Sequence, residues 1–346
     1  MRTLQEARKA GNCYIIAEAG VNHNSKLDLA LQLVDAAVDA GADCVKFQTY
    51  ITEDDVLESS EAAIYQKENI RENSQFQLLK KLELPFSDFV KIKNYCDQRD
   101  IQFLSTPFEL KSFQFLNSLN MPFWKVPSSD IDNYPLLEAM AKTKLPIVLS
   151  TGMSDLKEIE EIMRLMSEWH NDDIIILHCN TQYPTSFHDV NLRAMLTLQD
   201  KFNCDIGYSD HTLGINVPIA AVALGAKVIE KHFTLNREME GPDHKASLEP
   251  DELKAMVEAI RQTELALGDA KKTISDSARQ NQIAARKSIY ATKNIEMGDV
   301  FNAENIACKR PAGHLSPLLW PNLIGKKAKC SYFKDEAIRE EEINVK

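Results

Sequence analysis

The chain has 346 residues, of which 44% are hydrophobic and 26% charged, and it carries a net charge of −11. Its size is typical of one large domain or two unequal ones. The acidic balance argues against nucleic acid or an anionic membrane as the partner, because both ligands attract a basic protein face. No apolar run reaches the ~20 residues of a membrane helix, and the first residues lack the apolar core of a signal peptide. We therefore expect a cytoplasmic protein.

From residue 12 to about residue 266, short β-rich runs alternate with amphipathic helical stretches, such as those at 27–40, 156–169 and 251–267. The eight runs are CYIIAEAG, CVKFQTY, IQFLSTPF, FWKVPSS, LPIVLSTGM, IIILHCN, CDIGYSD and KVIEKHF. Eight strand-helix pairs in about 250 residues are the count and size of a (β/α)8 TIM barrel. We assign the barrel to residues 1–267, with a long acidic loop at 51–75 near its mouth.

Beyond the barrel, residues 268–285 are polar and predict a linker, and residues 286–346 change to short β-like runs with turns. A domain of about 60 residues is near the lower limit for independent stability. We therefore expect this second domain to rest on another surface. The seven cysteines lack the paired spacing that a disulfide framework or a zinc knuckle requires.

Polar residues end each of the eight runs, and the C-terminal ends of barrel strands carry the chemistry in such folds. They are Glu18, Lys46 with Gln48, Ser105 with Thr106, Lys125 with Ser128, Ser150 with Thr151, His178, Ser209 with His211, and Glu230 with His232. Alternate residues of a strand share a face. The spacing therefore directs Glu230 and His232 to the barrel mouth, and Lys231 away from it.

His211 and His232 end the seventh and eighth strands, which are neighbours in a closed barrel. Two imidazoles at this position suggest a labile divalent metal such as Mn²⁺, Fe²⁺, Co²⁺ or Zn²⁺, with carboxylates nearby at Glu18, Asp210 and Asp243. The alternative is that each histidine is a hydrogen-bonded residue of the barrel wall.

Lys46 and Lys125 end the second and fourth strands, where a buried lysine needs an anionic partner or loses its charge. A bound carboxylate or phosphate is one such partner, and an internal ion pair with Glu18 or Glu230 is another. The hydroxyl residues Ser128, Ser150, Thr151 and Ser209 favour an anion pocket. Ser154 is the expected cap of the helix that follows STGM. Glycine-rich nucleotide motifs are missing from the sequence.

Seven ordered motifs resemble those of bacterial sialic acid synthases: IIAEAGVNHN, GADCVKFQTY, FLSTPF, VLSTGM, GYSDHT, EKHFTL and GPDHKASLEP. The tail, with NIEMGDVF, ENI, KRP and IGKKA, resembles the small antifreeze-like (SAF) domain of these enzymes. The resemblance therefore covers nearly the whole chain. It implies that phosphoenolpyruvate (PEP) condenses with an open-chain N-acetylmannosamine-type sugar to give a nonulosonic acid and phosphate.

The resemblance also implies roles for single residues. His211 and His232 hold the metal, usually Mn²⁺ with Mg²⁺ or Co²⁺ as alternatives, and Glu18 and Asp243 act through metal-bound water. The PEP contacts are Lys46, Lys125, Ser128, Ser150, Thr181 and Ser209. The sugar contacts are Gln48, Asp130, Tyr183 and Arg310, of which Arg310 reaches into the barrel of a partner chain. A domain-swapped homodimer follows from this last role.

Two features depart from the family pattern. Ser129 and Asp130 stand where the family commonly has Gly-Glu, and the shorter acid displaces a hydrogen bond by more than ~1 Å in a site that needs geometry held to ~0.5 Å. His314 stands where we expect a small residue. The favoured activity is N-acetylneuraminate synthase, with N,N'-diacetyllegionaminate synthase as the alternative. A metal-dependent aldolase and a non-catalytic sugar-binding protein are the more distant alternatives.

Overall fold

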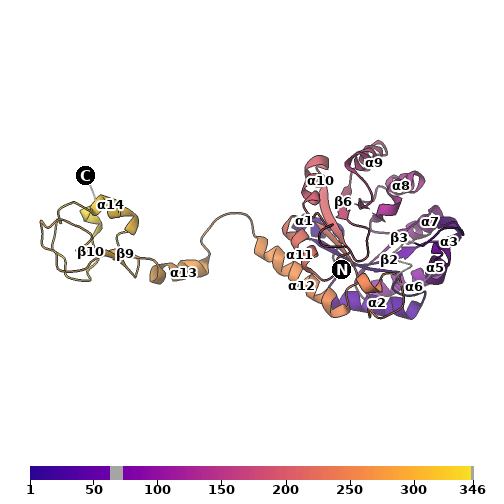
Figure 1. Cartoon of the computed structure of the whole chain (residues 1–346), viewed down its shortest axis with the longest axis horizontal. Coiled ribbons are helices and arrows are strands. Elements are labelled where there is room, and N and C mark those ends of the chain that lie inside the picture. Colours follow the sequence, from indigo (N-terminus) through magenta and orange to yellow (C-terminus); the bar gives the residue numbers. More distant parts are fainter. Residues whose placement is uncertain (63–72, 344–346) are drawn as a thin grey trace. The chain divides into compact units, whose positions relative to one another are not determined.

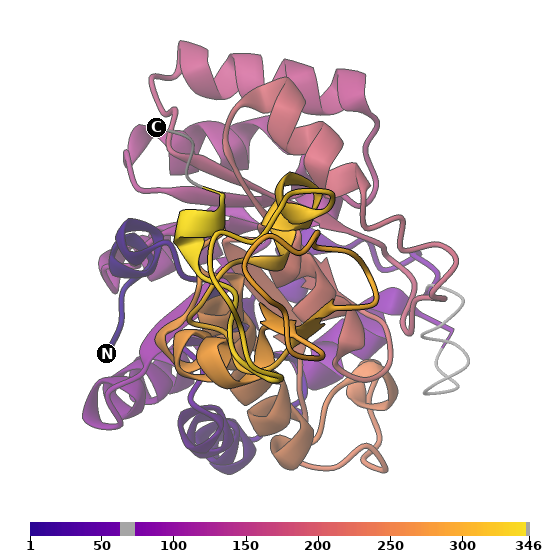
Figure 2. The ribbon, with the colours of Figure 1, turned by 90° about the vertical axis from the view of Figure 1, so that its left-hand side faces the viewer.

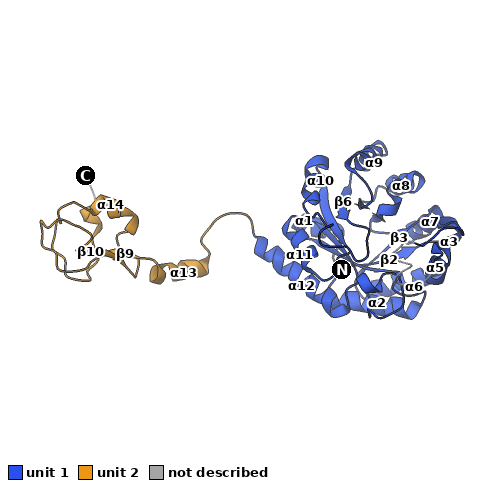
Figure 3. Cartoon of the chain, viewed as in Figure 1, with its two compact units in different colours: residues 1–268 blue, residues 269–346 orange. Residues whose placement is uncertain are grey.

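A computed structural model describes residues 1–62 and 73–343 of the chain. The chain divides into two compact units, Met1–Gly268 and Asp269–Lys346 (Figure 3). The second unit thus begins inside the segment that the sequence predicts as a linker.

The first unit is built around eight parallel strands in the order β3-β2-β1-β8-β7-β6-β5-β4. Within the described residues β3 and β4 lie in contact but share no hydrogen-bonded ladder, so the barrel is nearly closed. All eight predicted strands are present, and the predicted TIM barrel is confirmed. The strands are β1 Tyr14–Gly20, β2 Cys44–Thr49, β3 Gln102–Pro107, β4 Trp124–Val126, β5 Ile147–Ser150, β6 Ile174–Cys179, β7 Asp205–Asp210 and β8 Val228–His232.

Helices form an outer layer around the strands (Figure 1). Those of the first unit are α1 Leu4–Ala10, α2 Leu27–Ala40, α3 Thr52–Asp55, α5 Gln75–Leu82, α6 Phe86–Gln98, α7 Leu110–Ser118, α8 Tyr134–Lys142, α9 Leu156–Glu168, α10 Ala194–Phe202, α11 Asn216–Ala223 and α12 Pro250–Leu267. Short 3-10 turns lie at Ser128–Asp130 and His244–Ala246.

Helix α2 shows how the sequence produces this layer. Its buried side chains recur every three or four residues, at Ala30, Leu33, Val34 and Ala37, so that one face lies against the sheet. Gly41 ends the helix with φ at 77°, a conformation that glycine adopts without steric cost, and the chain then enters β2. The cap of α9 differs from the expectation. Asp155, and not Ser154, accepts the first helical N–H groups, because Glu158 completes a capping box with it.

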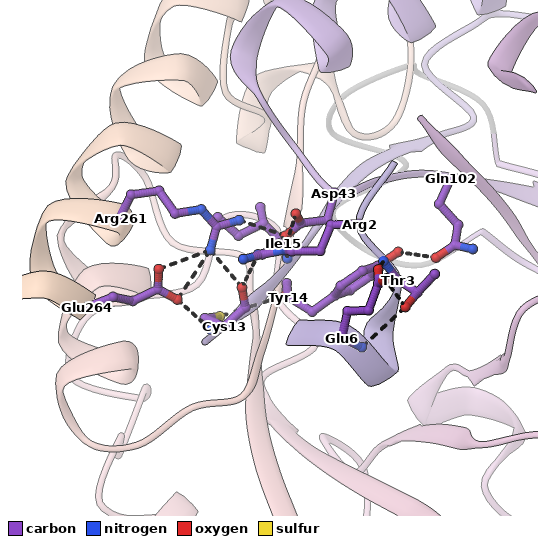
Figure 4. Close-up of polar contacts among 10 residues, drawn as sticks. All are labelled: Arg2, Thr3, Glu6, Cys13, Tyr14, Ile15, Asp43, Gln102, Arg261 and Glu264. Atoms are coloured by element: carbon purple, nitrogen blue, oxygen red, sulfur yellow. Dashed lines mark hydrogen bonds and ion pairs between the residues drawn. The ribbon is translucent and has the colours of Figure 1, made fainter. Parts of the chain in front are cut away.

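The N-terminal ends of β1 and β2 are held by a polar network at the end of the barrel opposite the mouth (Figure 4). The carboxylate of Asp43 is buried between Arg2, at 2.6 Å, and Arg261 of α12, at 2.7 Å. It also accepts the backbone N–H of Ile15 in β1. Both guanidinium groups donate to the carbonyl of Cys13. The network therefore joins the N-terminal segment, the first two strands and the last helix of the barrel.

The second unit has its own small core, to which Ile289, Phe301, Ile306, Leu323 and Tyr332 contribute. Its elements are α13 Asp276–Ala285, β9 Ser288–Ala291, β10 Ile306–Lys309 and α14 Trp320–Leu323, with 3-10 turns at Pro317–Leu319 and Glu340–Glu342. Strands β9 and β10 pair antiparallel, and much of this unit, orange to yellow in Figure 2, is irregular chain. In the described residues of either unit, no helix has the length and apolar character needed to cross a membrane.

Candidate active site

The C-terminal ends of the strands surround one cavity of about 690 Å³, a volume typical of a small-molecule site. Every strand except β3 contributes a lining side chain. The cavity brings together all of the predicted site residues of the barrel: Glu18, Lys46, Gln48, Lys125, Ser128, Asp130, Ser150, Thr181, Tyr183, Ser209, His211, His232 and Asp243.

Two buried lysines and two buried glutamates alternate on the floor of this cavity. Lys46 Nζ lies 3.0 Å from Glu18 Oε2 and 3.5 Å from Glu230 Oε2. Lys125 Nζ lies 3.6 Å from Glu230 Oε1. The internal ion pairs that the sequence left open are therefore present. All four of these side chains line the cavity, so both ammonium groups remain accessible to an anion that binds there.

The protonation of this cluster follows from burial and the neighbouring charges. Burial by itself would raise the pKa of Glu230, but Lys125 and Lys46 hold it at about 2. Burial raises the pKa of Glu18 to about 7, against the opposing effect of Lys46. Burial lowers the pKa of Lys125, which lies farther from a carboxylate than Lys46 does.

Hydroxyl groups surround Lys125. Its ammonium donates to Ser150 Oγ at 2.8 Å and to the carbonyl of Val126 at 3.1 Å. Ser128 Oγ accepts the backbone N–H of Gly152 at 2.9 Å. A Cβ on Gly152 would lie 2.8 Å from the sulfur of Cys179, so only glycine allows this close approach. An ammonium group and hydroxyls thus line one side of the cavity.

The two imidazoles lie side by side at the ends of the neighbouring strands β7 and β8. The ring centroids of His211 and His232 are 5.5 Å apart, and the ring of Tyr183 packs 4.1 Å from that of His211. His211 Nδ1 donates to the carbonyl of Asn180 at 2.6 Å, which leaves Nε2 with a lone pair. Burial lowers the pKa of His211 to about 4 and also lowers that of His232, so both rings are neutral at pH 7.

This pair fits a divalent metal. Nδ1 of His232 is buried and has no hydrogen-bond partner within the described part of the chain. Neutral imidazoles with free lone pairs are good ligands for Mn²⁺, Co²⁺ or Zn²⁺. Across residues 1–62 and 73–343, no three His, Cys, Asp or Glu side chains lie close enough together to hold an ion. An ion held by the two imidazoles would have its remaining positions open to water or substrate.

Asp243 lines the cavity from the loop after β8, and burial raises the pKa of its carboxyl group to about 7. The backbone of this loop is held from below, because Ser247 donates to the carbonyl of Asp243 at 2.7 Å and accepts from Asn22 at 3.0 Å. The carboxyl group is thus presented to the cavity by a fixed turn.

The outer part of the cavity carries the predicted sugar contacts and one residue that sequence reasoning missed. Gln48 donates to Glu18 at 3.2 Å, and Asp130 accepts from Ser129 at 2.8 Å and Asn133 at 3.0 Å. The missed residue is Asp55, at the end of α3. Burial, with Asp130 as a smaller contribution, raises the pKa of Asp55 to about 7. Its only sequence signal was its place in the loop predicted near the mouth.

Five polar residues of the strand ends do not line the cavity, contrary to the sequence expectation: Ser105, Thr106, Thr151, His178 and Asp210. The hydroxyl of Thr151, which was expected in the anion pocket, donates to the carbonyl of Leu177 at 3.0 Å. Asp210 was considered near the metal, but it has the opposite parity to His211 and pairs with Lys231 of β8, on the face of the barrel wall that points away from the cavity. His178 bonds to the carbonyl of Val190 at 2.7 Å. Lys231 does not line the cavity, as predicted, and it is fully buried.

Arg310 and His314 belong to the second unit. Arg310 is exposed, and its Nε donates to the carbonyl of Ala285 at 2.9 Å. His314 packs edge-on against Tyr290 and lines a separate surface groove of this unit. The contact between Arg310 and a sugar therefore stays a prediction.

Fold and cavity together define a (β/α)8-barrel enzyme with a polar site at the C-terminal ends of its strands. The NeuB family model matches residues 33–272 and the SAF domain model matches residues 286–344. The chain therefore belongs to the NeuB family. It is a PEP-condensing synthase of the nonulosonic acid class.

Individual relatives agree with this assignment. The chain is 46% identical to the N,N'-diacetyllegionaminic acid synthase of Campylobacter jejuni, over 94% of this chain and 98% of that protein. It is 34% identical to the human N-acetylneuraminate-9-phosphate synthase, over 95% of this chain and 92% of that protein. The crystal structure of a sialic acid synthetase from Leptospira borgpetersenii matches with a TM-score of 0.70 and 36% identity, over 78% and 90% of the two chains.

Proposed function

We propose that this chain works in the cytoplasm and condenses PEP with the open-chain form of a 2,4-diacetamido-trideoxymannose. The products are N,N'-diacetyllegionaminate and inorganic phosphate. The observation that carries the proposal is one cavity in which Lys46 and Lys125 face the imidazole pair of His211 and His232. PEP bound at the lysines can react with a carbonyl group polarised at the histidines only if both pairs of residues line the same cavity.

In this proposal Lys46 and Lys125 bind the anionic groups of PEP, with Ser128, Ser150, Thr181 and Ser209 as hydroxyl donors. Lys125 is the better-placed cation for the incoming anion, since its nearest carboxylate is 3.6 Å away while that of Lys46 is at 3.0 Å. The attachment of the ligand at two ammonium groups directs C3 of PEP toward the outer part of the cavity.

His211 and His232 are the proposed ligands of a divalent metal, Mn²⁺ in our proposal with Mg²⁺ or Co²⁺ as alternatives. When bound, the metal supplies Lewis acidity at the aldehyde oxygen of the sugar. Gln48, Asp130 and Tyr183 orient the sugar chain so that its aldehyde carbon faces C3 of PEP.

The reaction balances with one water molecule. A bond forms between C3 of PEP and the aldehyde carbon, and the aldehyde oxygen takes up a proton. Water then adds to the cationic C2 and loses one proton, which balances the proton taken up by the aldehyde oxygen. The C2–O bond to phosphate breaks as the new C2 hydroxyl becomes a carbonyl group, and the second proton of the water leaves with inorganic phosphate. Glu18 and Asp243 are the proposed groups that orient this water and accept its proton. A pKa of about 7 suits both carboxyl groups to proton exchange near neutral pH.

The choice of acceptor is a revision of the sequence-based preference for N-acetylmannosamine. The chain is 46% identical to the legionaminic acid synthase of C. jejuni, compared with 36% to the Leptospira synthetase and 34% to the human enzyme. The shorter acid at Asp130 also departs from the pattern on which the earlier preference rested. Because the two sugars differ in their amide and hydroxyl groups, a few outer residues of the cavity can decide between them.

We also propose that the second unit acts on the barrel of another copy, through Arg310, in a domain-swapped homodimer. Residues 269–346 hold 14 Lys and Arg against 10 Asp and Glu, a net charge of +4, which leaves −15 on the rest of the chain. Opposite net charges favour association of one unit with the other. The acidic mouth residues Asp55 and Asp130 are suitable partners for a guanidinium group.

The decisive experiment incubates the metal-loaded enzyme with PEP and a panel of N-acylated sugars, and measures phosphate release together with product mass. We expect release that depends on sugar and is fastest with the 2,4-diacetamido sugar. Faster turnover of N-acetylmannosamine would identify a neuraminate synthase instead. Phosphate release that does not depend on sugar would reject the condensation. Sugar cleavage without PEP would indicate an aldolase. A parent protein without turnover, together with a His211→Ala variant that still binds the sugar, would indicate a binding protein.

A further inference from the structure

A buried ion pair lies between the two strands that carry the imidazoles, on the face of the barrel wall that points away from the cavity. Lys231 Nζ is 2.5 Å from Asp210 Oδ2, and the side chains of both residues have no solvent exposure. Neither residue lines the cavity. Neither residue takes part in the reaction proposed above.

The pair sits at the last rung of the ladder between β7 and β8, where Asp210 and Lys231 are register partners. His211 follows Asp210 and His232 follows Lys231 in the sequence. The ladder therefore ends immediately before His211. Beyond the ladder, His211 is held by the bond from its Nδ1 to Asn180 and by its carbonyl, which accepts the backbone N–H of Thr185 at 2.8 Å. The two charged side chains add a third set of contacts.

Lys231 holds the chain on both sides of His211. Its ammonium group donates to the carboxylate of Asp210 and also to the carbonyl of Thr212. The Asp210 carboxylate in turn accepts the backbone N–H and the hydroxyl of Thr212, each at 3.0 Å. The turn 210–212 is thus closed by the residue next to His232. The pair therefore links the backbone on both sides of His211 to the strand that carries His232.

Stability alone is a poor explanation of this pair. Both charged groups are removed from water, and this desolvation costs free energy that their mutual attraction must offset. Buried ion pairs are often replaced by apolar or neutral residues without loss of stability, and their better-attested use is to fix register. Fixing the register of β7 and β8 would matter at a site where ring nitrogens from these two strands must bind the same ion.

We propose that Lys231 and Asp210 are positioning residues that set the spacing of His211 and His232, and thereby the affinity for the divalent metal. This inference rests on the proposed metal site. Partners outside the ligand set typically change metal affinity by about 10- to 100-fold when they are removed. We expect a loss of this size for the pair.

The test is Mn²⁺ binding by the full chain, measured from the electron paramagnetic resonance signal of the free ion. The variant Lys231→Met/Asp210→Asn keeps the side-chain volumes, and the Asn oxygen still accepts from Thr212. We expect its Mn²⁺ affinity to fall by about 10- to 100-fold, while the circular dichroism spectrum of the metal-free protein is unchanged. The matched control, Arg261→Met/Asp43→Asn, removes a partly buried ion pair at the far end of the barrel, and we expect it to leave Mn²⁺ affinity at the parent value.

A milder variant covers the case in which the double variant does not fold. Thr212→Val keeps the shape of the residue and removes one hydrogen bond to Asp210, and we expect a loss of a few-fold in Mn²⁺ affinity. Parent-like affinity in a folded double variant, or in Thr212→Val, would overturn the inference. A parent protein that binds no Mn²⁺, Co²⁺ or Mg²⁺ would reject the proposed metal site itself, a result distinct from equal binding by parent and variant.

Discussion

The substitution Lys125→Met tests the anion pocket most directly. The side chain is 2% exposed, and methionine has a similar length and an uncharged end. The ammonium group now donates to Ser150 and lies 3.6 Å from Glu230. We expect the variant to fold, because the hydroxyl of Ser150 can rotate and Glu230 keeps its bond from Ser209 at 2.8 Å.

The expected loss of PEP affinity follows from the contact that is removed. A hydrogen bond to a charged group contributes about 1.5–3 kcal/mol, which corresponds to about 10- to 150-fold in the dissociation constant. Without Lys125, the pKa of Glu230 also loses the largest effect that lowers it, so part of the lost charge is offset by protonation of Glu230. The observed loss should therefore lie toward the lower half of this range.

The assay is a calorimetric titration of PEP into the metal-loaded protein at pH 7.5. The matched control is Lys142→Met, which removes an exposed lysine from helix α8 and should leave PEP binding unchanged. Equal PEP affinity in a folded Lys125→Met variant and in the parent would refute the assignment of this lysine to the anion pocket. Loss of folding in the variant would instead show that the ammonium group is needed to satisfy Glu230.

Three further predictions concern the outer part of the site. Asp130→Asn should raise the KM for the sugar by about 10-fold and leave that for PEP unchanged in steady-state kinetics; equal effects on both would remove Asp130 from the sugar side. Mixing inactive His211→Ala and Arg310→Ala proteins after unfolding and refolding together should restore activity, because a mixed dimer holds one complete site; no recovery would exclude action between chains. Asp55→Asn should raise the melting temperature at pH 8 and not at pH 4. Its folded pKa of about 7 lies above the unfolded 3.8, so this carboxyl group's contribution to stability falls as pH rises through that window. The same shift at both pH values would contradict the raised pKa.

Much of the architecture could be predicted from hydrophobic periodicity and from the polar loops between the apolar runs. All eight strands and helices such as α2 and α12 follow the predicted runs, because residues buried on both faces leave long apolar stretches between polar loops. The paired motifs at the strand ends also located the cavity, since the C-terminal ends of parallel strands meet at one edge. The cap of α9 was misplaced by one residue, because two adjacent side chains, Ser154 and Asp155, can both accept a helical N–H.

The partners of the charged residues could not be read in the same way. The sequence left open whether Lys46 and Lys125 pair with Glu18 and Glu230 or with a ligand, and the structure has the internal pairs inside the ligand cavity. Asp210 was grouped with the histidines because it is next to one of them. Its side chain points the other way, because successive residues of a strand face opposite sides of the sheet.

The amino-acid sequence by itself determined the barrel, the SAF tail and the types of side chain at each strand end, because these depend on local periodicity and on ordered motifs. Tertiary structure alone decided which side chains share the cavity, which charges neutralise one another and which carboxyl groups have a raised pKa. The physical reason is that these properties depend on burial and on distances between strands that are up to about 200 residues apart in the chain, as Glu18 and His232 are.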